Sequence, residues 1–172
     1  QKISAPAPTA PSGGSDVATL TPPAVRDGDA YIVSGSKTFI TSGMRADYLT
    51  VAVRTGGPGA GGVSALLIEG DSPGLTRTPL KKMGWWCSDT AQLHFDNVRV
   101  PVAHLLGQEN RGFEIFMRNF NHERLALASP TVAPARGGPA EPSDRGAPRT
   151  PVGNPLGGPP GPPPPPAARA PR

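Results

Sequence analysis

Residues 27–43 have the sequence DGDAYIVSGSKTFITSG, which alternates short apolar runs with turn residues. Asp27-Gly28 indicates a turn, and Tyr31 to Val33 is typical of a strand. Ser34-Gly35 indicates a second turn, and Lys37 to Thr41 alternates, with Thr38 and Ile40 on one face. The stretch therefore predicts a β-hairpin.

Further strands follow along the chain. Residues 48–55 and 63–69 are a second pair of strand candidates around a glycine-rich linker at 56–62, and residues 90–100 predict another strand. Residues 1–24 contain five prolines and predict extended chain or loop. Short strands with Gly/Pro turns and no intervening helix indicate a mainly β fold, an antiparallel barrel or sandwich.

After Pro101 the apolar period changes from that of a strand to that of a helix. The apolar positions are Phe113, Phe116, Met117, Phe120 and Leu127. With Asn110 available as N-cap, they predict an amphipathic helix over roughly 111–128. The prolines that begin at Pro130 predict that the helix ends near Ala128.

The C-terminal stretch differs in composition from the rest. From Ser129 onward lie 15 of the 24 prolines and a net charge of +3 out of +4, from five Arg against Glu141 and Asp144. These basic residues have no aromatic neighbours, which argues against nucleic-acid binding. We expect a β-domain at 1–104, the start of a helical domain at 105–128 and a disordered tail at 129–172.

The sequence also excludes several features. Cys87 is the single cysteine, so an internal disulfide is excluded, and no stretch approaches the roughly 18 apolar residues of a membrane span. The three histidines lack metal-ligand spacing, so no metal site is predicted. The start shows neither Met nor a signal pattern, and we interpret the chain as a piece of a longer protein from a reducing compartment, cytoplasmic in a bacterial-type cell.

Three places could carry chemistry. Glu123 falls close to the centre of the helix's apolar stripe, where burial raises a carboxyl pKa and suits a base, or it pairs with Arg124 or Arg118. Residues 37–43 offer an aromatic ring and hydroxyls to a planar ligand, or serve only β-packing. The loop at 9–16 offers backbone N–H groups to polar or phosphate atoms.

Several motifs, in this order along the chain, resemble the acyl-CoA dehydrogenase family. They are Gly14-Ser15-Asp16-Val17, Lys37 to Gly43, Lys82-Met83-Gly84, Asp89-Thr90-Ala91 through Phe95 to Pro101, Leu105-Leu106-Gly107 through Asn110 to Phe113, and Glu123-Arg124-Leu125. The resemblance covers residues 9–128. It implies a middle β-barrel domain that lies against FAD, between helical domains that complete the flavin and acyl-CoA sites.

The resemblance assigns the cofactor-binding residues. It implies that Thr9, Gly14 and Ser15 approach FAD in a loop, that Ser15 also meets the thioester, and that Phe39, Ile40 and Thr41 lie along the flavin ring. The chain departs from the family pattern in this loop. Ala10 replaces the usual Glu and Ser12 the usual Gly, and Pro6 and Pro8 stand where the family has a strand.

By the same resemblance, Glu123 matches the catalytic base of the isovaleryl- and long-chain-type members, and Asn121 and Arg124 line the acyl-CoA pocket. The implied reaction converts an acyl-CoA to a trans-2-enoyl-CoA, with FAD as cofactor. An electron-transfer flavoprotein, or oxygen in the related oxidases, accepts the electrons. The full-length protein is expected to be a homo-oligomer.

Other functions stay open from the sequence. The run Pro162 to Pro166 is typical of a polyproline II ligand, so the chain could be a non-catalytic remnant or adaptor. Flavin monooxygenases and acyl-CoA oxidases share the family's architecture. Dependence of flavin reduction on Glu123 would discriminate between these classes.

Overall fold

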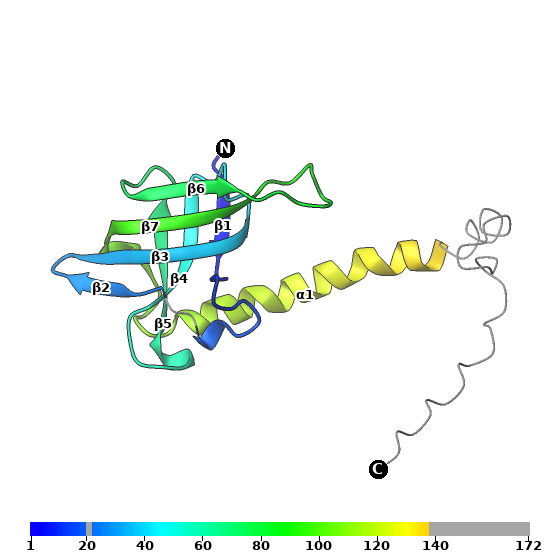
Figure 1. Cartoon of the computed structure of the whole chain (residues 1–172). Helices are drawn as coiled ribbons and strands as arrows, with labels where there is room; N and C mark the ends of the chain where they lie inside the picture. The colour runs from blue at the N-terminus through cyan, green and yellow to red at the C-terminus, as the bar shows by residue number, and fades with distance from the viewer. Residues whose placement is uncertain (20–21, 138–172) are drawn as a thin grey trace, which may run out of the picture. The chain divides into compact units, whose positions relative to one another are not determined.

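The computed structural model of the chain describes residues 1–19 and 22–137, so the predicted disordered tail falls mostly outside the described residues. The mainly β fold is confirmed for the unit Gln1–Asn121. Its strands form two four-stranded sheets rather than one closed barrel (Figure 1). No helix in the described part is long and apolar enough to cross a membrane.

The first sheet has the strand order β1-β4-β5-β8, with β1 Ser4–Ala7, β4 Tyr48–Arg54, β5 Val63–Glu69 and β8 Leu105–Leu106. The predicted pair around the glycine-rich linker is confirmed as the antiparallel pair β4 and β5. β1 runs parallel to β4 at the edge of the sheet, with Pro6 opposite Thr50. An edge strand tolerates a proline because one side of it needs no N–H donor.

The second sheet has the order β2-β3-β7-β6, with β2 Ala24–Asp27, β3 Ala30–Thr41, β7 Thr90–Pro101 and β6 Leu75–Pro79. The predicted turn at Asp27-Gly28 is confirmed, because β2 and β3 form a hairpin around it and Gly28 has a φ of 61°. The predicted turn at Ser34-Gly35 is wrong. β3 continues through it, and Ser34 faces a bulge at Asp96 and Asn97 of β7.

A second bulge lies in β3 itself. Lys37 pairs with Leu93 and Ile40 pairs with Ala91, so Thr38 and Phe39 together oppose one residue of β7. The extra residue breaks the strand's alternation, and the side chains of both Lys37 and Ile40 turn into the protein. The prediction that Thr38 and Ile40 share a face of a regular strand is therefore wrong.

The main core lies between the two sheets. Its large members include Leu49, Val51, Leu66 and Ile68 of the first sheet, and Tyr31, Val33, Ile40, Leu93, Phe95 and Val98 of the second. The opposite face of β4 and β5 carries Ala52 and Ala65, which belong to a second cluster with Phe116 of the helix. The first sheet is therefore buried on both faces.

The helix α1 spans Gly112–Gly137. Its predicted start is confirmed, and Gly112 lies so close to β5 that an added Cβ would stand 2.3 Å from the Ser64 carbonyl carbon. The predicted end near Ala128 is wrong. Proline keeps a helical φ and removes only one N–H, and the alanines around Pro130 and Pro134 favour helix.

The apolar stripe of the helix is buried only in its first half. Phe116 is buried, and Phe113, Met117 and Phe120 pack against the second cluster. Leu127, predicted to belong to the stripe, is 64% exposed in the second unit, which begins at His122. The packing of the helix onto the sheet therefore rests on its first three turns.

Lys37 is the buried charged side chain of the described residues, with no exposed surface. Its Nζ donates a hydrogen bond to the carbonyl oxygen of Pro8 at 3.0 Å. Burial disfavours the charged form of the amine and lowers the pKa of Lys37 from its usual 10.5 to about 7.

This pKa predicts a pH-dependent stability. The folded-state pKa lies below the unfolded one, so between pH 7 and 10.5 the unfolded chain binds more protons and stability rises with pH. From pH 6.5 to 9.5, we expect the unfolding free energy of the native chain to rise by about 3 kcal/mol relative to that of Lys37→Met. Urea denaturation at the two pH values measures it, and an unchanged difference would contradict the lowered pKa.

Candidate functional site

The predicted flavin residues on the loop at 9–15 and on strand β3 are joined by hydrogen bonds. Thr38 N–H donates to the Thr9 carbonyl at 3.1 Å. The Thr9 hydroxyl in turn donates to the Thr38 carbonyl. These reciprocal bonds place the start of the loop directly beside the bulge, so the structure brings together two segments that are 29 positions apart in the sequence.

The loop itself is ordered by short-range contacts. The N–H of Ala10 donates to the Gly13 carbonyl at 2.9 Å, and that of Gly13 donates back to Ala10 at 3.0 Å. An added Cβ on Gly14 would lie 3.1 Å from the Thr9 methyl group, so the glycine lets the loop fold against Thr9. Ser15 follows with an exposed side chain. The loop therefore presents a hydroxyl and backbone groups to a ligand.

The end of strand β3 presents an aromatic ring. Phe39 has a φ of 57°, a left-handed conformation that is unfavourable for a bulky residue, and its side chain is 72% exposed. Strained conformations of this kind cluster at ligand-binding sites. Thr41 is exposed, whereas the side chain of Ile40 is buried in the core, so only the backbone of Ile40 is available to a cofactor.

Asp89 fixes the chain just after this strand. Its carbonyl accepts a hydrogen bond from Ser42 N–H at 3.0 Å, and its carboxylate accepts one from Met44 N–H at 2.9 Å. The carboxylate also forms an ion pair with Arg45 at 2.9 Å. Sequence reasoning gave Asp89 no role, although it stands in one of the recognised motifs.

The proposed acyl-CoA residues lie on α1. Asn121 and Arg124 are exposed and Glu123 is half-buried. Asn121 is the last residue of the first unit, and Glu123 and Arg124 belong to the second. The assignment of Glu123 as catalytic base therefore rests on the motif Glu123-Arg124-Leu125, and it stays a prediction.

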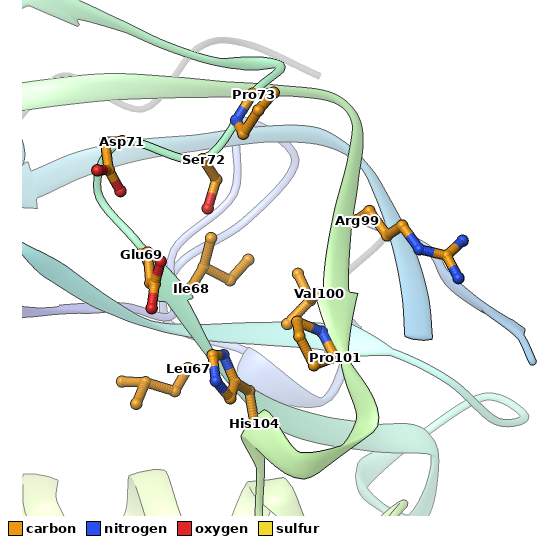
Figure 2. Close-up of a pocket in the computed structure, with 10 residues that line it drawn as sticks. All are labelled: Leu67, Ile68, Glu69, Asp71, Ser72, Pro73, Arg99, Val100, Pro101 and His104. Atoms are coloured by element: carbon orange, nitrogen blue, oxygen red, sulfur yellow. The ribbon is translucent and has the colours of Figure 1, made fainter. Parts of the chain in front are cut away.

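A cleft of the first unit lies elsewhere (Figure 2). It has a volume of about 540 Å³ and is lined by Leu67, Ile68, Glu69, Asp71, Ser72, Pro73, Arg99, Val100, Pro101 and His104. The Arg99 guanidinium forms ion pairs with the carboxylates of Asp27 and Asp29, at 2.9 and 2.7 Å. None of the predicted flavin residues lines this cleft, and no metal-binding group of three side chains occurs within residues 1–19 and 22–137.

The sequence at residues 5–98, more than half of the chain, matches the acyl-CoA dehydrogenase middle domain. This range includes both predicted flavin segments and the part of the Asp89 motif up to Val98.

Two curated relatives are similar over 74% of the chain. The acyl-CoA dehydrogenase apdG of Emericella nidulans is 47% identical over 131 residues, which are 30% of its length. The cyclohexane-1-carbonyl-CoA dehydrogenase of Geobacter metallireducens is 43% identical over 128 residues, 34% of its length. The chain thus spans about a third of each relative.

The fold is similar to a solved structure. A probable acyl-CoA dehydrogenase from Mycobacterium abscessus superposes with a TM-score of 0.78 at 51% identity, over 91% of this chain and 42% of that one. The family model, the two relatives and the solved structure all indicate the same family. The chain belongs to the acyl-CoA dehydrogenase family.

Proposed function

We propose that this chain provides the flavin-facing part of an FAD-dependent enzyme that converts an acyl-CoA thioester to its trans-2-enoyl-CoA. The observation that carries the proposal is the outward-turned ring of Phe39, held beside the Thr9 loop by the bonds between Thr9 and Thr38. An aromatic ring beside hydrogen-bond donors suits a planar cofactor, and strained backbone conformations cluster at ligand-binding sites.

The exposed groups of the loop and of the segment Phe39–Thr41 fit the cofactor. The Phe39 ring would lie along the flavin, the Thr41 hydroxyl would donate to its edge, and Ser15 and the loop amides after Thr9 would meet its polar atoms. Because Ile40 is anchored in the core, the ring and the hydroxyl are held at fixed positions on either side of it. Such preorganisation reduces the entropy lost on binding.

The proposed proton transfer belongs to Glu123. Its carboxylate would accept the α-proton of the thioester, while Asn121 and Arg124 bind polar parts of the acyl-CoA. FAD, when bound, supplies the acceptor for the hydride that leaves the β-carbon. We further propose an electron-transfer flavoprotein as electron acceptor and a homo-oligomer for the whole protein, as the family resemblance implies.

The first test concerns Phe39. Phe39→Ala removes the aromatic wall, and we expect FAD to bind roughly fivefold to tenfold more weakly, because a ring contact of this kind contributes about 1 kcal/mol. The fold should keep its stability, since the ring is mostly exposed. Quenching of flavin fluorescence during titration gives the affinity. Val25→Ala, which truncates a 65% exposed side chain on β2, is the control; equal affinities of the two variants would exclude a role for the ring.

The second test concerns Glu123. With FAD bound, anaerobic addition of a long-chain acyl-CoA should bleach the visible flavin band of the native chain, and Glu123→Gln should abolish the bleaching while FAD stays bound. Glu114→Gln is the control, because it removes an exposed carboxylate of the same helix, which is paired with Arg111. The flavin band of this variant should bleach as in the native chain. Undiminished bleaching of the flavin band in Glu123→Gln would exclude Glu123 as the catalytic base.

The remaining outcomes separate the other functions. A chain that retains no FAD is a remnant or an adaptor. Rapid reoxidation by oxygen after bleaching indicates the oxidase branch, and flavin that no acyl-CoA reduces indicates the monooxygenase branch.

A further inference from the structure

Lys37 lies where the two flavin segments meet, and the proposed chemistry does not use it. It is the last residue of β3 in regular register before the bulge that turns Phe39 outward. Its side chain reaches the carbonyl of Pro8, which directly precedes Thr9 of the loop. One residue thus contacts the base of the loop and begins the bulge.

Packing alone does not account for an amine at this position. Burying a cation is unfavourable unless it is paired, and no ion pair within residues 1–19 and 22–137 includes Lys37. Methionine would fill a similar volume without removing a charge from water. What the side-chain amine adds is a hydrogen-bond donor inside the protein.

That donor has a defined target. Strand β1 ends at Ala7, and Pro8 is buried, so its carbonyl needs a partner within the protein. Together with the two bonds between Thr9 and Thr38, the bond to Pro8 fastens consecutive loop residues to consecutive residues of β3. It is the one link of the three that comes from the buried side of the strand.

We propose that Lys37 is a positioning residue for the flavin site, whose side-chain amine donates to the Pro8 carbonyl and thereby fixes the Thr9–Ser15 loop against the segment Phe39–Thr41. The inference rests on the proposed function, because the site that it organises is the same one. Lys37 itself touches neither cofactor nor substrate.

Hydrogen exchange of the whole chain without FAD tests the positioning directly. In Lys37→Met we expect the amides of Ala10, Gly13 and Thr38 to exchange roughly fivefold to tenfold faster, the effect of losing a buried hydrogen bond of about 1 kcal/mol. Amides of β4 and β5 should keep their rates. Lys81→Met, at an exposed lysine in the loop before β7, is the matched control. Unchanged exchange at the loop, or equal acceleration throughout the chain, would overturn the proposal.

A second variant separates the hydrogen bond from the volume. Lys37→Gln keeps an N–H donor without charge, so it should recover part of the loop's protection and part of the FAD affinity lost in Lys37→Met. It also keeps the test decisive if Lys37→Met fails to fold. Equal loss of protection in both variants would count against the donor's role.

FAD titration of the same proteins connects positioning with the cofactor. We expect Lys37→Met to weaken FAD binding roughly tenfold while its melting temperature does not fall, a split that a purely structural role would not give. If the native chain binds no FAD but Lys37→Met still loosens the loop alone, the proposed function fails and the local role of Lys37 is supported. If FAD binds equally well to both, the proposal is overturned.

Discussion

The bulge between Lys37 and Ile40 is the constraint on which the rest of the site depends. One extra residue in β3 lets Lys37 and Ile40 both point inward, and Phe39 is then forced outward in a left-handed conformation. With Lys37 pointing inward, strict alternation without the bulge would bury the Phe39 ring and expose Ile40. The strain is sustained because the strand is held on both sides, by pairing with β7 and by the bonds to Thr9.

The supporting fold is rigid where this strain must be held. β4 and β5 are covered by the second sheet on one face and by the start of α1 on the other, with small residues at the helix contact. Gly112 permits that contact because no Cβ fits between the helix and the backbone of Ser64 and Ala65. In the second unit the exposed Leu125 and Leu127 have no comparable cover among the described residues.

The sequence was informative where local rules decide and failed where tertiary contacts do. The two strand candidates on either side of the glycine-rich linker were confirmed as β4 and β5. Ser34-Gly35, however, has the composition of a turn, and only pairing with β7 turns it into continuous strand. One local rule also failed: the helix period predicted the packing of Phe116, but the rule that proline ends a helix did not predict the continuation through Pro130. The burial of Lys37 could not be predicted, since an isolated lysine in a strand is normally solvated.

We propose that the Thr9–Ser15 loop and the segment Phe39–Thr41 form one flavin-binding surface, which is separate from the cleft of Figure 2. A map of backbone amide NMR shifts in the whole chain during titration with FAD tests this proposal. We expect shift changes that concentrate at Gly14, Ser15, Phe39 and Thr41. Changes that concentrate at Glu69, Asp71 and His104 of the cleft instead, or saturable binding without any change at the loop and strand, would contradict it.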